Sequence, residues 1–426
     1  MICACRTLLF FNRMLLLREP NRPQLVLYFQ VHQPKRLRHF SFFDIGSNKS
    51  YFDDDLNGCI TRRIASECYL PANRVLLETI RMYPHVRINF SISGTALDLF
   101  EQFAPEVIDS FRLLAETGCV EFLSETSHHS LSSLFSESEF IRQLANHRSR
   151  IQNLFGQNPT VVRNTELIYN DRIGLLLAGQ GYHGAISEVK IIDAPSTIEY
   201  DIYTHPMPVA LKLMLRSNLL SDTLSFRYRQ NGVTLALSEY TTLLYNAAAH
   251  ARVMLIGLDY ETFGEHFKPD TGILRFLHRL LIRLATEDRV VLSKASDVFS
   301  EMEPSAPLSI PAYTSWADES KDLSAWLGND LQKGAFSTMK SLERLVMKDP
   351  ALTELWRNLQ TSDHYYYMCT KGAQDGEVHS YFSHYGNPYE AYINFMNVMK
   401  DLEVRAAAIN QVSAPTELPI ADTAEF

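Results

Sequence analysis

The stretch "VMLIGLDYETFGEH", Val253 to His266, joins a short apolar run to a dense group of acids. The run Val253–Ile256 is typical of a buried strand. The ten residues that follow it hold three carboxylic acids and one histidine. In a β/α barrel the active-site residues come from the carboxyl ends of the strands. This stretch therefore predicts a buried strand whose carboxyl end carries chemistry.

Six further segments rich in aliphatic and β-branched residues recur along the chain. They are Leu25–Val31, Val86–Ile92, Val120–Leu123, Thr160–Val162, Gly184–Ser187 and Val290–Leu292. Near-continuous apolar strands of this length are typical of a parallel sheet that is covered on both faces. Together with Val253–Ile256 they predict a sheet of seven strands.

Helical patterns fall between several of these strands. Residues Ala96–Thr117 have helical spacing with a break at Pro105, which cannot donate a backbone hydrogen bond. Residues 136–155 open with a capping box, Ser136 with Glu139, and Gly272–Thr286 carries an apolar stripe. Strands that alternate with helices predict a β/α barrel or a doubly wound sheet.

We expect the chain to be divided into a barrel and a helical region. The barrel is predicted for residues 23–305 and the helical domain for 306–410, with tails at 1–22 and 411–426. Residues at about 190–250 interrupt the alternation of strands and helices, so we interpret them as an excursion over the barrel. Within it, Asn231-Gly232 predicts a type I′ hairpin.

The composition limits the kind of partner. The 426 residues are 46% hydrophobic and carry a net charge of −9 without a long basic run. This excludes a nucleic-acid or anionic-membrane partner in favour of a neutral substrate, because phosphate binding depends on cationic side chains. We find no apolar stretch of about 18 residues, so no membrane span is expected. Six scattered cysteines predict free thiols in a reducing compartment, hence a cytoplasmic protein.

The first residues, "MICACRTLLFFNRMLLLREPNRP", imitate a signal peptide. However, Asn12 and Arg13 break the apolar stretch, and the small-residue cleavage signal is missing. We therefore expect an untidy or mis-assigned start rather than a secretion signal.

Polar side chains follow six of the predicted strands. They include His32 and Gln33, Asp98, Glu125 with His128 and His129, Glu166, Glu188, and the acids after Ile256. One acid or histidine after a strand is usually structural, and we interpret Glu188 and Asp98 as helix-capping acids. Capping does not account for acids and histidines at six strand ends, so an active site is predicted at this edge.

Two chemistries compete for such a site. Histidines and carboxylates together can hold a divalent metal that activates water, as in a metal-dependent hydrolase or a sugar deacetylase. Alternatively, two carboxylates can flank a glycosidic bond, one as nucleophile and one as proton donor. No H-E-x-x-H motif is present, and the 20 tyrosines and 24 phenylalanines supply rings on which sugars stack. These observations favour the glycosidase.

Five segments support this interpretation, because their order along the chain resembles the five sequence motifs of glycoside hydrolase family 57. They are "HQP", "SGTALD", "NTELIYN", "GLDYETFGEH" and "SDHYYYM". The chain is similar to the α-amylase-type members of this family from Leu25 to about Met368. The resemblance implies an incomplete seven-stranded (β/α) barrel with a C-terminal helical region. It also implies an α-glucan substrate, retention of anomeric configuration, and no metal or other cofactor.

The same resemblance implies roles for individual residues. Glu166 matches the nucleophile and Asp259 the general acid/base. Further residues are expected to bind the substrate, either because the resemblance implies it or because they lie near Glu166 and Asp259 in the motifs. They are His32, Gln33, His128, His129, Glu261, His266, Asp363 and His364. The second motif is the least distinctive, so the roles of Gly94 and Asp98 stay open.

Several functions remain compatible with these residues. Water as the acceptor gives an α-amylase, whereas a sugar hydroxyl as the acceptor gives a 4-α-glucanotransferase or a branching enzyme. A protein of another class, a non-catalytic glucan-binding protein, would bind the same substrate without cleaving it. We favour the α-amylase, and the sequence does not indicate an oligomeric state.

Overall fold

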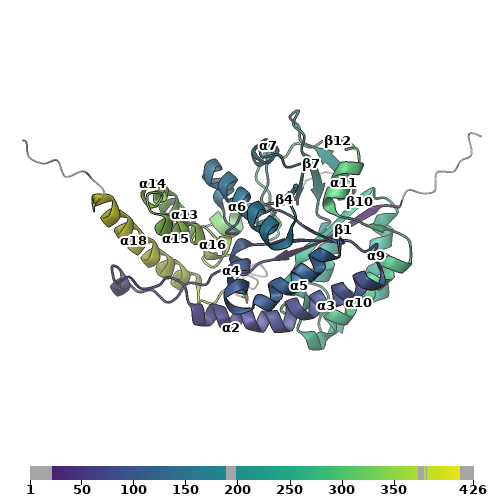
Figure 1. Cartoon of the computed structure of the whole chain (residues 1–426), viewed down its shortest axis with the longest axis horizontal. Coiled ribbons are helices and arrows are strands. Elements are labelled where there is room, and N and C mark those ends of the chain that lie inside the picture. Colours follow the sequence, from purple (N-terminus) through teal and green to yellow (C-terminus); the bar gives the residue numbers. More distant parts are fainter. Residues whose placement is uncertain (1–21, 189–197, 373–378, 380, 413–426) are drawn as a thin grey trace, which may run out of the picture.

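The computed structural model describes residues 22–188, 198–372, 379 and 381–412, which form a mixed α/β fold (Figure 1). The tails predicted for residues 1–22 and 411–426 lie almost wholly outside these ranges. The first part of the predicted excursion, residues 189–197, also lies outside them. The described chain is an incomplete seven-stranded (β/α) barrel with a C-terminal helical region.

Seven parallel strands surround the centre of the barrel. They are β1 (Gln24–Val31), β2 (Ile88–Ile92), β3 (Val120–Phe122), β4 (Val161–Arg163), β5 (Gly184–Ser187), β7 (Lys212–Leu215) and β10 (Val253–Asp259). Four of them form one sheet in the order β10, β1, β2, β3, and the other three lie in a second sheet in the order β7, β5, β4. Single parallel bridges join the two sheets, from Ser124 to Val162 and from Arg216 to Leu255. The ring therefore closes through two seams where backbone pairing is sparse.

One strand of this ring differs from the prediction. The apolar run at 290–292 forms β11 (Val291–Leu292), which pairs only with the first two residues of β1 and lies off the ring. The seventh place belongs to β7, which pairs in parallel with β5. The prediction that residues 190–250 form an excursion over the barrel was therefore wrong for β7, which is part of the ring. β7 has only four residues and follows Pro206 and Pro208, so its apolar pattern is too short to identify from the sequence.

The remaining short strands lie beside the ring. Strand β6 (Ile202–Thr204) runs antiparallel to β7, and β12 (Ala306–Pro307) pairs in parallel with β6. Strands β8 (Arg229–Gln230) and β9 (Val233–Thr234) form the hairpin that the sequence predicts. Asn231 and Gly232 both have positive φ, 51° and 79°, as a type I′ turn requires.

Helices cover the outside of the barrel. They are α2 (Asp54–Ile64), α3 (Leu70–Met82), α4 (Gly94–Phe103), α5 (Pro105–Glu116), α6 (Glu137–Phe155), α7 (Asp171–Gly179), α8 (Asn218–Ser225), α9 (Leu237–Ala248), α10 (Ile273–Thr286) and α11 (Ala295–Glu301). The break predicted at Pro105 is confirmed, because α4 ends and α5 begins there. Ser136 caps α6, as predicted. The carboxylate of Glu139 does not complete the capping box and instead pairs with Arg142 and Arg357.

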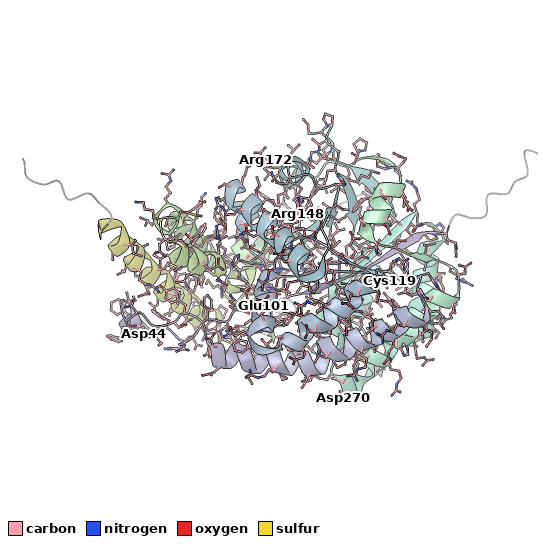
Figure 2. The ribbon with its side chains drawn as sticks, viewed as in Figure 1. Asp44, Glu101, Cys119, Arg148, Arg172 and Asp270 are labelled. Carbon is pink, nitrogen blue, oxygen red and sulfur yellow. The ribbon has the colours of Figure 1, made fainter. Side chains whose placement is uncertain are left out.

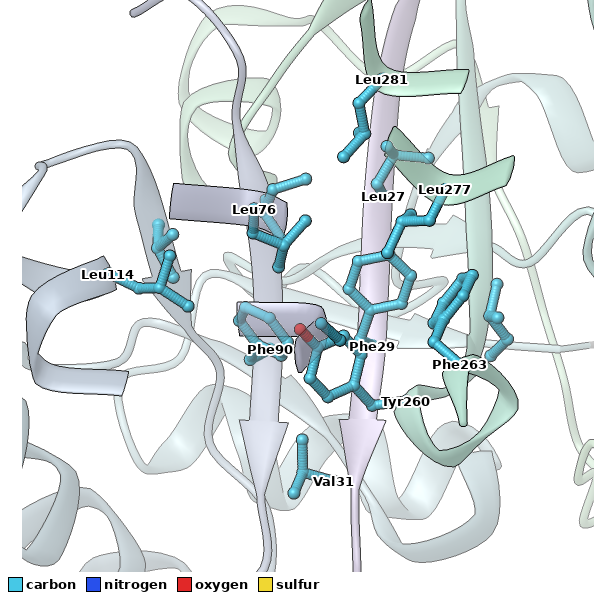
Figure 3. Packing of buried hydrophobic residues seen from close by; sticks show 14 of the residues in the cluster. Leu27, Phe29, Val31, Leu76, Phe90, Leu114, Tyr260, Phe263, Leu277 and Leu281 are labelled. Atoms are coloured by element: carbon cyan, nitrogen blue, oxygen red, sulfur yellow. The ribbon is translucent and has the colours of Figure 1, made fainter. Parts of the chain in front are cut away.

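The apolar side chains pack in distinct layers. On the outer face of the first sheet, Phe29 and Phe90 meet Leu76, Leu114 and Leu277 from the covering helices (Figure 3). Burial of each such side chain contributes roughly 1.5–3 kcal/mol. Inside the ring a second cluster is contributed by the strands themselves: Val26, Tyr28, Leu123, Val161, Ile186, Met214, Val253 and Leu255. The barrel is therefore filled with side chains below its carboxyl edge.

From residue 324 onwards the described chain is helical. The elements are α12 (Ser324–Leu327), α13 (Asp330–Ser341), α14 (Glu343–Val346), α15 (Pro350–Asn358), α16 (Ser362–Tyr366) and α18 (Pro388–Val412). The segment at 36–53, which has Asp44 near its tip, reaches across to α18 (Figures 1 and 2). Its Phe40 N–H donates to Asn394 Oδ1 at 2.6 Å, and its Tyr51 hydroxyl donates to Asp401 Oδ2 at 2.6 Å. These bonds hold the helical region against the barrel.

Some predictions concern single groups rather than elements. Cys3 and Cys5 lie outside the described residues, and the other four cysteines carry free thiols. None of the described helices is long and apolar enough to cross a membrane. In the same residues, no group of three or more His, Cys, Asp or Glu side chains is arranged to hold a metal ion.

Candidate active site

A layer of charged side chains caps the apolar filling of the barrel. Side chains alternate along a strand, so the residue two positions after an inward-facing one also faces inward. This places Gln30, Glu125, Arg163, Glu188 and Arg216 directly above Tyr28, Leu123, Val161, Ile186 and Met214, and Asp259 four positions after Leu255. Negative and positive groups alternate around much of this layer. The carboxyl edge predicted from the sequence is therefore where the polar residues gather.

Glu166 lies in a strained turn directly after β4. The turn is the 3-10 helix η4 (Thr165–Leu167), in which Glu166 and Leu167 have φ of 55° and 52°. Such left-handed conformations cost roughly 1–3 kcal/mol each in non-glycine residues and occur often at functional sites. The turn brings the carboxylate of Glu166 to donors from three different parts of the chain.

These donors surround both oxygens of the Glu166 carboxylate. Trp316 Nε1 donates to Oε2 at 2.6 Å, and Ser362 Oγ lies 3.2 Å from Oε1. His129 Nε2 also lies 3.1 Å from Oε1. Burial opposes the charge of Glu166, but the hydrogen bond and charge of His129, together with Arg163, outweigh it and lower the pKa of Glu166. Glu166 is therefore held as a carboxylate.

His129 connects Glu166 to a second buried acid. Its Nδ1 lies 2.8 Å from Glu125 Oε2, and Glu125 is fully buried. Burial disfavours the imidazolium, but the bonds to Glu125 and Glu166 outweigh it and raise the pKa of His129 to about 9. Burial also disfavours the Glu125 carboxylate, yet His129 and Arg163 bring its pKa down to about 2. At neutral pH the three residues form a row of alternating charge.

Asp259 ends β10 and has a different environment. Within the part of the chain that the structure describes, no hydrogen bond reaches its carboxyl group. Burial, followed by the negative charge of Glu166, raises the pKa of Asp259 to about 6, although Arg163, His129 and Arg216 act in the opposite direction. The two acids are thus separated in their protonation state. An acid whose pKa is raised beside one that stays ionised is the arrangement that glycosidases need.

Glu261 lies two residues after Asp259 and is almost fully buried. One of its oxygens accepts the backbone N–H of His32 at 3.2 Å and a short hydrogen bond from the Tyr69 hydroxyl. Burial and the nearby Asp259 raise the pKa of Glu261 to about 8. Tyr69 ends a π-helical turn, Ala65–Tyr69, between α2 and α3, and such turns are frequent at functional sites.

His32 contacts His129 in the barrel and Asp363 in α16. Its ring stacks on that of His129 with 3.8 Å between the centroids. Nε2 lies 2.8 Å from Asp363 Oδ2, and Nδ1 lies 2.7 Å from Ser93 Oγ. Burial and the neighbouring His129 lower the pKa of His32, so it is the neutral ring of the pair.

The turn of α16 directs the side chains of Asp363 and His364 to different neighbours. Asp363 holds His32, and although burial opposes its charge, His32 and His129 lower the pKa of Asp363. His364 is buried, with its ring 5.7 Å from that of Phe395 in the helical region. Burial lowers the pKa of His364 to about 4. The structure therefore brings Asp363, but not His364, into contact with the other predicted site residues.

Three further predicted residues lie apart from the two central acids. His128 Nε2 contacts Glu354 in α15 at 2.8 Å, which ties the barrel to the helical region. Gln33 is buried and accepts a hydrogen bond from Arg36 at 3.0 Å. The ring of His266 lies 5.5 Å from that of Phe382, between centroids.

The second motif has a structural explanation. A Cβ atom on Gly94 would lie 2.1 Å from the backbone oxygen of Ser127, so only glycine fits beside the loop that leads to His129. Asp98 does not cap a helix as predicted, because it lies within α4 and pairs with Lys35 and Arg150.

Glu188 does not match its prediction either. Its carboxylate is fully buried and pairs with Arg216 and Lys321 at 2.6 Å each. It therefore belongs to the charged layer under the site rather than to a solvated helix end.

Three residues that contact or surround Glu166 were not predicted from the sequence. Trp316 follows no predicted strand, and nothing in its sequence neighbourhood indicates a site. Ser362 opens the fifth motif, "SDHYYYM", but only its neighbours Asp363 and His364 were predicted as site residues. Arg163 lies at the inward end of β4, fully buried, with its guanidinium 4.8 Å from the centroid of the Trp316 ring. The alternation of β4 was the one available signal, because it places Arg163 on the same side as Val161.

Comparison with known proteins confirms the family resemblance that the five sequence motifs indicated. Residues 26–311 match the model of the family described as "Glycosyl hydrolase family 57". A protein of Methanocaldococcus jannaschii described as "Putative alpha-amylase" is 35% identical over 398 residues, 88% of this chain and 83% of that protein.

Solved structures share the fold at lower identity. A branching enzyme of Thermococcus kodakaraensis is similar with a TM-score of 0.67 and 14% identity, over 92% of this chain and 91% of that chain. A 4-alpha-glucanotransferase of Thermococcus litoralis has a TM-score of 0.61 and 15% identity, over 81% of this chain and 56% of that chain.

Proposed function

Since the chain belongs to glycosyl hydrolase family 57 and is an α-amylase-like glycosidase, we propose that it hydrolyses internal α-1,4-glucosidic bonds in starch-type glucans or maltooligosaccharides with retention of configuration. One observation carries this proposal. The Glu166 carboxylate lies against three donors, whereas the Asp259 carboxyl receives none from the described residues. One acid is thereby suited to attack and the other to donate a proton.

In the first step, a Glu166 oxygen attacks the anomeric carbon and forms a glycosyl ester as the bond to the leaving oxygen breaks. The proton of Asp259 moves to that oxygen. His129 and the Trp316 N–H hold the carboxylate in position for the attack. In the second step, water attacks the same carbon, the ester breaks to restore Glu166, and the water proton returns to Asp259.

The competing functions differ in the second step. A glucan hydroxyl in place of water would make the protein a 4-α-glucanotransferase or a branching enzyme. Hydrolysis is favoured by the 35% identical relative described as an alpha-amylase, whereas the transferase and the branching enzyme share the fold at 15% and 14% identity. Incubation with a single maltooligosaccharide separates the cases. Only shorter products are expected, and a ladder of longer and shorter products would mean transfer.

The roles of the two acids are tested by replacing each with alanine. We expect Glu166→Ala and Asp259→Ala to lose turnover of soluble starch. On an aryl maltoside, which needs no proton donor, added azide should give the glycosyl azide of inverted configuration with Glu166→Ala and of retained configuration with Asp259→Ala. Asp270→Asn, at an exposed position in the 3-10 helix Pro269–Thr271, is the matched control (Figure 2). Near-normal starch turnover by either alanine variant would contradict the assignment.

A non-catalytic glucan-binding protein predicts a different result. The wild-type chain would then bind maltooligosaccharides and release no shorter product on long incubation. Product analysis of the wild type therefore decides between the two classes before any variant is made.

A further inference from the structure

A row of aromatic rings lies beside the candidate active site and has no part in the mechanism above. It consists of Tyr366, His379, Phe382, Tyr381 and His266, which we call the aromatic strip. Tyr366 stacks on His379 with 3.7 Å between centroids. Phe382 lies 6.4 Å from Tyr366 and 5.0 Å from Tyr381, and His266 contacts both Phe382 and Tyr381 at 5.5 and 6.1 Å.

Two rings of the strip, those of Tyr381 and Phe382, are exposed to solvent. Tyr381 is 58% exposed and Phe382 is 39% exposed. Exposed large aromatic side chains that adjoin one another mark binding surfaces more often than isolated ones do. The charges of Glu265, Lys268 and Arg63 lie close enough to the Tyr381 hydroxyl to influence its ionisation. Apolar ring faces and charged groups therefore occur together on this surface.

The strip is attached to the site at both of its ends. Tyr366 belongs to α16, whose first residues are Ser362, beside Glu166, and Asp363, which holds His32. This helix lies where the helical region meets the barrel (Figure 1). At the other end, the backbone N–H of His266 donates to the Glu261 carbonyl at 2.9 Å, in the loop that follows Asp259.

We propose that Tyr381 and Phe382 form a platform that binds glucose units of the glucan on the leaving-group side of the cleaved bond. This inference rests on the proposed function. A glucose ring has an apolar C–H face and a rim of hydroxyls, so it fits an aromatic face bordered by charged groups. The platform adjoins the loop of Asp259, which protonates the leaving oxygen, so the units that it binds belong to the departing chain.

The platform has a measurable consequence for chain length. A short substrate such as maltotriose fills the positions at Glu166 and Asp259 without reaching Tyr381. A longer one such as maltoheptaose gains the extra contact. In Tyr381→Ala and Phe382→Ala, kcat/KM for maltoheptaose should fall about 3- to 10-fold for each ring removed, chiefly through KM, while kcat/KM for maltotriose stays unchanged. Tyr381→Trp should retain the preference for the long substrate.

Phe43→Ala is the matched control, because Phe43 is 91% exposed on the segment beside α18 and lies outside the strip. An equal effect on both substrates, or no effect on either, would overturn the platform. A change of oligomeric state in Tyr381→Ala, measured by light scattering, would also overturn it, because the rings would then serve a contact between copies.

Failure of the proposed function gives a different pattern. If the wild type acts on neither substrate, the proposed reaction is wrong and the kinetic test does not report on the platform. Calorimetry with the Glu166→Gln variant then tests the platform without turnover. It should bind maltoheptaose more tightly than maltotriose, and Tyr381→Ala on the same background should reduce this difference about 3- to 10-fold. Equal affinities for the two sugars in Glu166→Gln itself would reject the platform.

Discussion

Removal of the charge of Arg163 should move the whole pH profile of activity. Its side chain is fully buried, and its guanidinium nitrogens have no hydrogen-bond partner among the described residues. The guanidinium lies 4.8 Å from the centroid of the Trp316 ring, and the indole N–H of that ring donates to Glu166 at 2.6 Å. The Trp316 ring therefore contacts both the positive charge and the proposed nucleophile.

This arrangement allows the size of the effect to be calculated. Opposite unit charges about 6–7 Å apart interact by roughly 2–3 kcal/mol at an effective permittivity of about 20, which is about 2 pKa units. Arg163 lowers the pKa of Glu166 and of Asp259. In Arg163→Met we therefore expect the pKa of Glu166 and the pKa of Asp259 both to rise.

The direction of each limb follows from the protonation state that the proposed mechanism requires of each acid. Glu166 must be ionised, so activity appears as pH rises through its pKa, and a higher pKa moves the acid limb to higher pH. Asp259 must be protonated, so activity is lost as pH rises through its pKa of about 6, and this basic limb also moves to higher pH. The assay is kcat/KM for maltoheptaose across the pH range, which reports the groups of the free enzyme.

Arg163→Lys is the control, because it keeps the charge and should leave both limbs within a few tenths of a unit. The thermal midpoint of Arg163→Met, compared with its pH profile, separates this role from a purely structural one. The midpoint should fall, because the buried carboxylates of Glu125 and Glu166 lose a compensating positive charge, whereas a purely structural role would lower the midpoint without moving either limb. A folded Arg163→Met enzyme with the wild-type pH profile would refute the reasoning.

Two further substitutions test the surroundings of the acids. Glu261→Gln should keep kcat within roughly threefold of wild type at about pH 6, because burial and Asp259 hold the pKa of Glu261 near 8 and the residue is already neutral there; a loss of activity comparable to that of the Asp259 variants would contradict this. In Gly94→Ala, the new Cβ would displace the backbone of Ser127 and with it His129, so kcat on soluble starch should fall by about 100-fold. Unchanged kcat in that variant would show that the loop does not position His129.

The sequence predicted the regular part of the site because strand ends are local features. Glu166 and Asp259 each follow an apolar run, and parallel strands bring such ends to one edge. The strands themselves were predictable for the same reason, apart from β7, whose four residues are too few to establish a period.

The contacts made by loops could not be predicted in this way. Trp316 reaches Glu166 across 150 positions in the sequence, and no pattern around it indicates that distance. The difference between Asp363 and His364 also depends on tertiary structure, because one turn of α16 directs one residue to His32 and leaves the other against Phe395. Arg163 carried a usable signal in its strand, which the analysis of strand ends passed over because the arginine precedes the polar run.

The two seams of the barrel govern the spacing of the acids. Asp259 ends a strand of one sheet, and Glu166 follows a strand of the other. A retaining enzyme needs its carboxyl groups roughly 5–5.5 Å apart, whereas a separation of roughly 6.5–9.5 Å suits inversion. In the proposed retaining mechanism, a small widening along either seam would therefore alter the stereochemistry of the product as well as the rate.

Backbone pairing supplies one bridge at each seam, so side chains must provide the stiffness. Arg216 spans one seam by donating to the Gly257 carbonyl at 2.6 Å while it pairs with Glu188. Glu125 and His129 span the other and end on Glu166. These contacts of the charged layer therefore stiffen both seams and hold the proposed nucleophile and the proposed proton donor at a fixed separation.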